Sequence, residues 1–379
     1  MKHLGDITLI DGSKIEPVDV ITFGSPCQDL SIAGKRAGLA GQRSGLFMEA
    51  VRIIKQMQEA TNGEYPKYAV WENVPGAFSS NKGKDFLAVL EELIRIKEPA
   101  ISLPEPPKSK WSKAGEVSGS GWSLAWRTMD AQYWGVPQRR LRISLVLDLT
   151  GQRAGEILFE PESLRGHFAP SITPGQATAG AVENGAGTAN GVYAEVGNVC
   201  AFKLGNSEQA RSIGYAEEKD PNIVCYDARG NGDGMLSPTI TGDHNSRITD
   251  YTTVVIEKII RWIVRRLTPT ECERLQGYPD GWTDLGEWVD SKGKAHKAAD
   301  APRYKALGNS IALPQWYYVL GGIADRLPDN ATLGSLFDGI GGFPYVWTQL
   351  HAGRKELCVW ASEIEEFPIA VTKVHFPES

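Results

Sequence analysis

The order of short apolar runs and helical repeats is the feature that most restricts how this chain of 379 residues can fold. The mainly apolar run Val18 to Phe23 ends in the turn Gly24-Ser25-Pro26, which predicts a buried strand. Apolar residues at helical spacing between positions 46 and 57 predict a helix, and Tyr68 to Trp71 then predicts a second strand. Strand, helix and strand in succession favour a parallel α/β sheet, in which ligands bind beyond the carboxyl ends of the strands.

The same pattern continues along the chain and resumes near its end. No internal repeat interrupts it. The further expected elements are a helix through Phe86, Leu90 and Leu93, a strand over Arg142 to Leu149, a helix over Leu313 to Leu327, a strand over Leu333 to Phe337, a helix starting near Tyr345 and a strand over Leu357 to Ala361.

The length predicts two domains, and the texture of the sequence changes near residue 165. Residues 174–198 are rich in Gly and Ala and are typical of a flexible insertion, and the segment after them has short apolar runs between turns. We therefore expect the first part of an α/β domain at residues 1–165, a loop- and strand-rich domain at 166–299, and the second part of the α/β domain at 300–379.

Composition excludes several classes of protein. The five cysteines are far apart and form no Cys-x-x-Cys pair, and the six histidines have no ligand spacing, so we expect no metal site and no disulfide framework. No apolar run approaches the roughly 18 residues that span a bilayer, and the N-terminus lacks a signal-peptide core, so we expect a cytoplasmic protein with no membrane partner.

The net charge of −6 argues mildly against unspecific coating of polyanions. A local basic face is enough for DNA binding, and two arginine clusters, at 139–142 and 261–266, are candidates for one. A solvated surface is the alternative interpretation of such clusters.

Cys27 lies between Pro26 and Gln28 at the junction of a strand and a loop, which predicts a nucleophile. A glycine-rich loop over 337–343 follows another predicted strand, and its missing Cβ atoms let a ligand approach the backbone. Glu363 follows the next strand, where an acid suits ribose hydroxyls.

Eight short motifs share one property, which is that each resembles a motif of a single enzyme family. They are Gly5-Asp6-Ile7, Ser25-Pro26-Cys27-Gln28, Glu72-Asn73-Val74, Gln138-Arg139-Arg140-Leu141-Arg142, Arg266-Leu267-Thr268-Pro269 with Gln276-Gly277-Tyr278-Pro279, Gly308-Asn309-Ser310, Phe337-Asp338-Gly339-Ile340-Gly341-Gly342 and Glu363. Together they make the chain resemble the DNA (cytosine-5)-methyltransferases over most of its length outside residues 150–260.

The resemblance implies a Rossmann-like methyltransferase sheet that binds S-adenosyl-L-methionine, together with a smaller target recognition domain. Glu363 matches the acid that binds the ribose, and Asp6 matches the residue that contacts the adenine. The implied cofactor-binding residues are Phe337, Asp338, Gly339, Gly341, Gly342, Glu363, Asp6, Ile7, Pro26, Asn309 and Ser310.

The resemblance also implies a covalent mechanism, with Cys27 as the thiolate that adds to carbon 6 of cytosine. Carbon 5 of the resulting enamine-like ring then attacks the methyl group. Glu72 would hydrogen-bond N3 and the exocyclic amine, and Arg142 would contact O2, with Arg140 of the same motif counted among the catalytic residues. Loss of the proton on carbon 5 and elimination of Cys27 would release 5-methylcytosine.

The implied substrate is double-stranded DNA with its target base flipped out. The small, basic segment from Ser31 to Gly38 resembles the mobile loop of the family, and residues 166–299 should form the recognition domain across a DNA cleft. The expected DNA-binding residues are Gln28, Ser31, Lys35, Arg36, Gln138, Arg229, Thr239 and Arg247.

The order of the motifs departs from the family, because the cofactor loop comes last instead of first. Joining Ser379 to Met1 restores the family order, which predicts a circular permutation with residues 327–332 as a linker. On this interpretation Ser379 and Met1 lie close in space.

Two alternatives remain open at this point. A tRNA cytosine-5 methyltransferase is one, although such enzymes tend to lack a large recognition domain and often carry Pro-Pro-Cys-Gln where this chain has Ser25-Pro26-Cys27-Gln28. A DNA-binding protein that has lost catalysis is the other. The family leads us to expect a monomer, and a restriction endonuclease as a biological partner is an open expectation.

Overall fold

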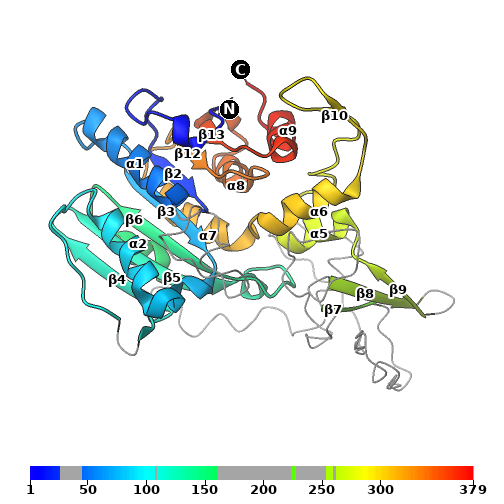
Figure 1. Ribbon diagram of the computed structural model, residues 1–379, viewed down its shortest axis with the longest axis horizontal. Coiled ribbons are helices and arrows are strands. Elements are labelled where there is room, and N and C mark those ends of the chain that lie inside the picture. Colours follow the sequence, from blue (N-terminus) through cyan, green and yellow to red (C-terminus); the bar gives the residue numbers. More distant parts are fainter. Residues whose placement is uncertain (26–44, 107–108, 160–222, 228–252, 259–261, 379) are drawn as a thin grey trace.

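The computed structural model describes residues 1–25, 45–106, 109–159, 223–227, 253–258 and 262–378. Its centre is an eight-stranded sheet with helices on both faces (Figure 1). In spatial order the strands are β1 (Lys2–His3), β13 (Cys358–Ser362), β12 (Leu333–Leu336), β2 (Val20–Phe23), β3 (Tyr68–Asn73), β6 (Leu141–Asp148), β5 (Trp122–Asp130) and β4 (Ala114–Gly119).

The sheet is mixed, whereas the sequence predicts a parallel one. The five strands from β1 to β3 are parallel, and β6, β5 and β4 continue the sheet in antiparallel pairs. The connection between β5 and β6 covers only residues 131–140, which is shorter than a parallel crossover requires. The expected strand at 142–149 is thus present, and its direction follows from this short connection.

Two layers of helices cover the sheet, and alternate side chains of each strand feed two cores. On β2, Val20 packs into one core, while Ile21 and Phe23 pack into the other with α1 and α2. The helices are α1 (Gly45–Ala60), α2 (Lys84–Ile94), α3 (Ala154–Leu158), α5 (Pro269–Gln276), α6 (Asp300–Asn309), α7 (Pro314–Ala324), α8 (Gly342–Leu350) and α9 (Glu366–His375).

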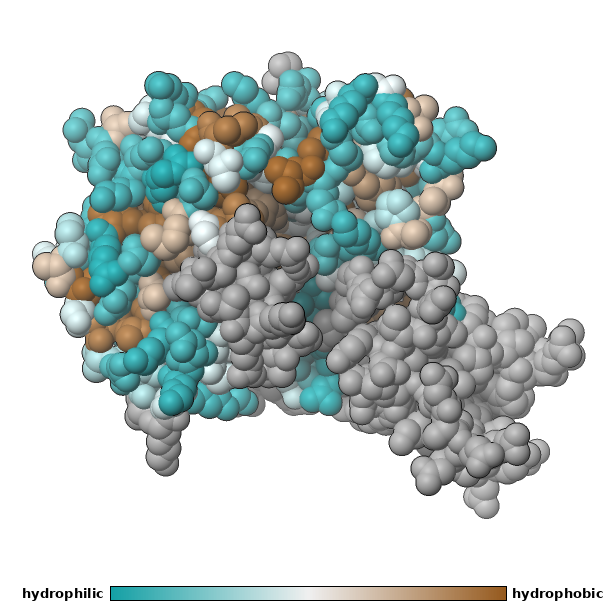
Figure 2. Space-filling view, viewed as in Figure 1, coloured by the Kyte–Doolittle hydropathy of each residue, from teal (hydrophilic) through white to brown (hydrophobic). Residues whose placement is uncertain are grey.

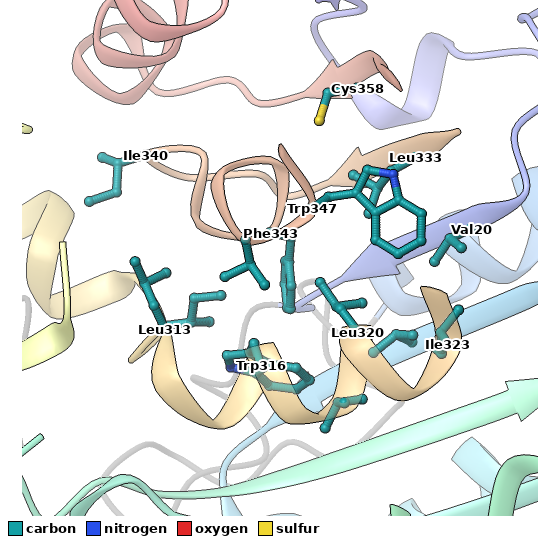
Figure 3. Packing of buried hydrophobic residues seen from close by; sticks show 14 of the residues in the cluster. Val20, Leu313, Trp316, Leu320, Ile323, Leu333, Ile340, Phe343, Trp347 and Cys358 are labelled. Carbon is teal, nitrogen blue, oxygen red and sulfur yellow. The ribbon is translucent and has the colours of Figure 1, made fainter. Parts of the chain in front are cut away.

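Helices α7 and α8 pack against each other over the middle of the sheet (Figure 3). Trp316 of α7 meets the ring of Phe343 of α8 edge to face, with 4.9 Å between ring centroids. The indole N–H of Trp347 donates to the carbonyl of Ala331 at 3.1 Å. These buried aromatic residues fix α8, whose first turn follows the glycine loop, to the rest of the fold.

The start and the end of the described chain meet at one edge of the sheet (Figure 1). The amino group of Met1 donates to the carbonyl of Pro377 at 3.2 Å, and the N–H of His3 donates to the Glu378 carboxylate at 3.3 Å. The expected proximity of the two ends is therefore confirmed up to Glu378, and Ser379 lies outside the described residues.

The order of the parallel strands contains a reversal. Numbered from β12 onward as β12, β13, β1, β2 and β3, they lie in the sheet in the order 3-2-1-4-5, which is the order of doubly wound nucleotide-binding sheets. The reversal falls between β12 and β2, and ligands of such sheets bind at this point, beyond the carboxyl ends of the strands.

A separate three-stranded sheet is formed by β7 (Ile223–Asp227), β8 (Thr253–Lys258) and β9 (Trp262–Arg266). It falls in the region for which the sequence predicts a recognition domain at 166–299. After β9 the chain returns to the larger sheet, because Leu267, Leu275 and Trp282 pack into the core of α7 and α8. The expected boundary at residue 299 therefore does not coincide with a break in the packing. Residues 174–198 lie among those left undescribed.

On the face drawn in Figure 2, hydrophilic residues of the described chain surround several hydrophobic areas. Within the described ranges, no helix combines the length and hydrophobicity needed to cross a membrane.

Candidate active site

The reversal point of the sheet brings together loops that are distant in sequence. The glycine loop follows β12, and the segment Gly24-Ser25 follows β2 at the same edge. Strands β13, β1 and β3 also end on this side of the sheet, and the loops that follow them begin there, because these strands run parallel to their neighbours. The described candidate residues of these loops therefore gather at the carboxyl ends of the strands, where the crevice of such a sheet lies.

The glycine loop has a backbone that only particular residues adopt. Phe337, Gly339 and Gly341 have positive φ angles of 55°, 58° and 80°. Positive φ is strained for a phenylalanine and easy for glycine, so the loop stores strain beside the crevice. A Cβ atom added to Gly339 would meet no atom within 4 Å, so the loop is open to a ligand there.

Glu363 closes the loop from the neighbouring strand. One carboxylate oxygen accepts the N–H of Gly339 at 2.9 Å, and the other accepts the N–H groups of Ile364 and Glu365 at 2.7 and 2.9 Å. Glu363 therefore ties the glycine loop to the two residues that precede α9. The next side chain, Ile364, is 66% exposed at the same edge.

Asp338 places a buried carboxyl group in the glycine loop. It is 6% exposed, and neither carboxylate oxygen has a hydrogen-bond partner among the described residues. Burial raises the pKa of Asp338 to about 7; the nearby Ser335 hydroxyl opposes this shift, and the charge of Glu363 adds to it. An unsatisfied buried carboxyl group at a nucleotide-binding edge marks a functional position.

Asp6 lies after β1, in an exposed turn. Its carboxylate accepts the N–H and the hydroxyl of Thr8 at 2.9 and 2.8 Å. Ile7 beside it is buried, and Ser362 of β13 donates to the carbonyl of Gly5 at 2.7 Å. The turn that contains Asp6 is thus attached to the strand that precedes Glu363.

The motif Gly308-Asn309-Ser310 packs on the start of α8 through Tyr278. The hydroxyl groups of Tyr278 and Ser310 lie 2.5 Å apart. A Cβ atom on Gly342 would lie 2.5 Å from the same tyrosine oxygen, so only glycine fits there. Ser310 is buried and Asn309 is exposed, which leaves Asn309 the one of the two able to meet a ligand directly.

Glu72 and Arg142 form an ion pair at the catalytic edge. The Nε of Arg142 lies 2.9 Å from a carboxylate oxygen of Glu72, and each side chain is 14% exposed. The other oxygen lies against Gly24, where an added Cβ atom would be 3.2 Å away. Two residues that are 70 positions apart in the sequence are thereby brought together beside the segment that leads to Cys27.

Ser25 is held by two residues of β3. The indole N–H of Trp71 donates to the Ser25 hydroxyl at 3.0 Å, and the Asn73 amide donates to the hydroxyl at 3.3 Å. Both donors are buried, so they fix the backbone two residues before Cys27. Cys27 itself lies outside the described residues.

Arg140 and Gln138 occupy buried positions. Arg140 donates to the carbonyls of Gly308 and Ser310, so its head group orients the turn that carries Asn309. The sequence counts it among the catalytic residues, and that role stays a prediction. Gln138, expected to bind DNA, is fully buried and does not present its amide to solvent.

The other predicted site residues fall in ranges that the structure does not describe. They are Pro26, Cys27, Gln28, Ser31, Lys35, Arg36, Arg229, Thr239 and Arg247.

Two residues, one at the glycine loop and one next to Glu363, are missed by the sequence analysis. Trp282 donates its indole N–H to the carbonyl of Ile340 in the glycine loop at 2.9 Å and stacks on His375 with 3.6 Å between centroids. Ile364 is an exposed apolar residue next to Glu363. An apolar side chain directly after the predicted ribose acid was a signal for Ile364, whereas Trp282 had none beyond its nearness to Tyr278.

Comparison with known proteins identifies the family. Residues 1–97 and 113–324 match the family described as C-5 cytosine-specific DNA methylase. The chain belongs to this family. The match ends before the glycine loop, in keeping with the position of that loop after the other motifs.

Curated relatives of the chain cover most of its length. A DNA N-6-adenine-methyltransferase of Escherichia phage P1 is 30% identical over 86% of this chain, and the type II methyltransferase M2.BsuMI of Bacillus subtilis strain 168 is 26% identical over 79%. The type II methyltransferase M.HpaII of Haemophilus parainfluenzae is 26% identical over 82% of this chain and 73% of its own length. The chain spans 55% and 58% of the length of the first two relatives.

The family implies S-adenosylmethionine as the methyl donor, and the crevice of this methylase fits it. The cofactor carries a positive sulfonium and a positive ammonium group, which suit the acidic side chains of Asp338, Glu363 and Asp6 in the loops that follow β12, β13 and β1. Open space at Gly339 leaves room for a ligand against the backbone. Among the residues with described positions, no three His, Cys, Asp or Glu side chains cluster as metal ligands.

Proposed function

We propose that this chain methylates carbon 5 of cytosine in double-stranded DNA, with S-adenosylmethionine as the donor of an electrophilic methyl group. The observation that carries the proposal is the Glu72–Arg142 pair beside Gly24, at the start of the segment that contains Cys27. The pair offers a carboxyl group and a guanidinium group to one cytosine ring, next to the segment of the candidate nucleophile Cys27.

In this proposal the Cys27 thiolate forms a bond to carbon 6 of the flipped cytosine. Electron density moves to carbon 5, which would take the methyl group that S-adenosylmethionine supplies; the sulfur–methyl bond would break and S-adenosylhomocysteine would leave with its electron pair. A base then removes the proton from carbon 5, and the Cys27 bond breaks to give 5-methylcytosine. The tether from Ser25 to Trp71 and Asn73 supports this role, because it holds Ser25, two residues before Cys27, against β3.

Glu72 would hold a proton shared with N3 while negative charge develops on the ring. Arg142 would donate to O2 of the base, and its present bond to Glu72 keeps both groups in place before the base enters. Arg140 would act through the backbone turn that carries Asn309, on the cofactor side of the crevice.

The partners belong to the proposal as well. We infer a DNA duplex as substrate, because the family is DNA-specific and a separate small sheet, β7 to β9, lies where a recognition domain is expected. Because two of the relatives are named as type II methyltransferases, a cognate restriction endonuclease is the proposed biological partner. The expectations of a monomer and of a cytoplasmic location stand as predictions.

We also infer that the catalytic domain is circularly permuted relative to the family. The strand order supports this, since only numbering from β12 gives the doubly wound order 3-2-1-4-5. The contacts of Met1 with Phe376 and Pro377 support it too, because the two ends could be joined without moving the sheet.

Adenine methylation is the second candidate, because the phage P1 relative is named for it. Nearly half of that relative lies outside the match, and the motifs shared with the cytosine family favour carbon 5.

The test is sequencing of plasmid DNA, by a method that reads both 5-methylcytosine and N6-methyladenine, from cells that express the wild type or Cys27→Ser. We expect 5-methylcytosine at one short motif in the wild type and none in the variant. N6-methyladenine instead would establish the second candidate. No methylation by a folded wild type would contradict the proposal, and the same assay on tRNA would then test the RNA alternative.

A further inference from the structure

A hairpin between α5 and α6 reaches the loop of Glu363. It consists of β10 (Trp288–Val289) and β11 (Ala295–His296), and Figure 1 shows it next to α9. We propose that this hairpin, together with Lys305, clasps the turn of Glu363 and thereby sets the affinity and the exchange rate of the cofactor. The inference rests on the proposed function.

The hairpin is a built structure. Asp290 accepts the N–H groups of Lys292 and Lys294 at 3.0 and 2.9 Å, and its other oxygen lies 2.9 Å from Nε2 of His296. The ring of His296 in turn stacks on Trp288, with 4.2 Å between centroids and 12° between planes. One carboxylate thus organises both strands of the hairpin.

Three contacts join the clasp to the start of α9. The N–H and hydroxyl of Ser291 donate to the two Glu366 oxygens at 2.8 and 2.5 Å, and these bonds lower the pKa of Glu366. The Nζ of Lys305 lies 2.9 Å from both Glu365 oxygens. Trp288 meets the ring of Phe367 edge to face at 5.5 Å.

These contacts affect Glu363, the proposed cofactor-binding acid, because Glu363 directly precedes the residues that the hairpin and Lys305 hold. Glu363 bonds the N–H groups of Ile364 and Glu365, so its carboxylate is fixed by the same turn that the clasp grips from outside. The glycine loop grips the acid from inside, through the N–H of Gly339. The turn of Glu363 is therefore held by the glycine loop on one side and by the hairpin with Lys305 on the other. Loss of the contacts with the hairpin and Lys305 should make the position of the Glu363 carboxylate less fixed.

The far end of α9 is held by the same segment of chain. Trp282 stacks on His375 and bonds the carbonyl of Ile340, so one stretch that runs from Trp282 to Lys305 touches both loops of the crevice. A ligand that enters between the glycine loop and Glu363 would lie against elements that this stretch holds together.

The experiment compares the double variant Ser291→Ala with Lys305→Met against the wild type. The control is Lys84→Met, which breaks an ion pair of similar exposure with Glu105, far from the crevice. We expect the dissociation constant for S-adenosylhomocysteine, measured by calorimetry, to rise about tenfold in the double variant and to stay unchanged in the control.

Two readouts separate positioning from general damage. Amide hydrogen exchange should accelerate in the peptide 363–367 while that of the strands stays constant. The KM for the cofactor should rise while kcat and the KM for DNA stay within about twofold. Because Lys305→Glu repels Glu365, it should weaken binding, and the exchanged pair Lys305→Glu with Glu365→Lys should restore it.

The inference would be overturned if the double variant kept both the affinity for S-adenosylhomocysteine and the amide hydrogen exchange rate of residues 363–367 unchanged. Failure of the exchanged pair to restore binding would count against it in the same way. A folded wild type that binds no S-adenosylhomocysteine is a different result, because it would contradict the proposed function and remove the basis of the inference with it.

Discussion

At the residue scale, the carboxyl group of Asp338 is the group of the glycine loop that burial disfavours most. A carboxyl group that is buried without a hydrogen-bond partner in the described structure prefers its neutral form, and its pKa of about 7 expresses that preference. The protonated group contributes stability in full below the unfolded pKa of 3.8, and this contribution is lost as the pH rises through about 7.

Replacement of Asp338 with Asn should remove this pH dependence. The free energy of unfolding of the variant minus that of the wild type should be about 2 kcal/mol larger at about pH 8.5 than at about pH 5.5. Urea denaturation of both proteins at the two pH values measures it, and subtraction cancels the titration of groups that they share. A constant difference between the proteins would refute the assignment to Asp338.

The ion pair of Glu72 leads to a second prediction at this scale. Glu72→Gln keeps the shape of the side chain but loses the charge that pairs with Arg142 and the ability to hold the shared proton. We expect methyl transfer to fall about 100-fold or more, with cofactor binding within about twofold of the wild type. Glu105→Gln, which alters an exposed acid paired with Lys84, is the control and should retain full activity.

At the scale of elements, the contact between α8 and the Gly308–Ser310 turn depends on one missing methyl group. Because a Cβ on Gly342 would lie 2.5 Å from the Tyr278 hydroxyl and 2.7 Å from Ile311, the helix start cannot accommodate alanine without moving its neighbours.

Gly342→Ala should therefore lower the free energy of unfolding by about 1–3 kcal/mol, as measured by thermal or urea denaturation. Tyr278→Phe in the same chain should recover part of the loss by removing the crowded oxygen. Gly321→Ala in α7 is the matched control, because its nearest neighbour is 3.6 Å away, and we expect it to be neutral or stabilising. Equal effects at the two glycines would show that crowding at Tyr278 is not the cause.

The strands that the sequence predicts are those with an apolar pattern. β2, β3, β12 and β13 are found within two residues of their expected positions, because both of their faces are buried. β4 lies at the sheet edge with alternating exposed Ala, Glu and Ser side chains, which resemble a loop. The direction of β6 depends on its pairing partners, which composition cannot specify.

The sequence places its candidate site residues near one another, and their roles stay predictions. The parallel strands bring Glu72, Asp338 and Glu363 to one end of the sheet, and the antiparallel β6, which carries Arg142 near its start, begins there. The buried role of Arg140 depends on a partner 168 residues away, and only the folded chain reveals it.

At the scale of the whole molecule, the order of the strands and the contact of the chain ends make one prediction. A rearranged chain that starts at Asn330, ends at Asp329 and joins Ser379 to Met1 through a short Gly-Ser linker should fold to the same sheet. The new ends lie in an exposed turn, so no strand is interrupted.

We expect this rearranged chain to have the same far-UV circular dichroism as the original and a Tm within about 8 °C of it. Its control is a second rearrangement cut between Val146 and Leu147, inside β6, which should not fold because β6 pairs on both sides. A rearranged chain that is unfolded, or a control that is equally stable, would argue against permutation of a common sheet.

The hydrogen bond from Trp71 to Ser25 gives the molecule a built-in spectroscopic probe. The indole N–H of a ¹⁵N-labelled tryptophan gives one resolved NMR signal, and the chain has only 11 tryptophans to assign. Because Ser25 lies two residues before Cys27, the chemical shift and line width of the Trp71 signal should follow the cysteine segment as ligands are added. Motion of the candidate nucleophile could thus be observed with no label at the cysteine itself.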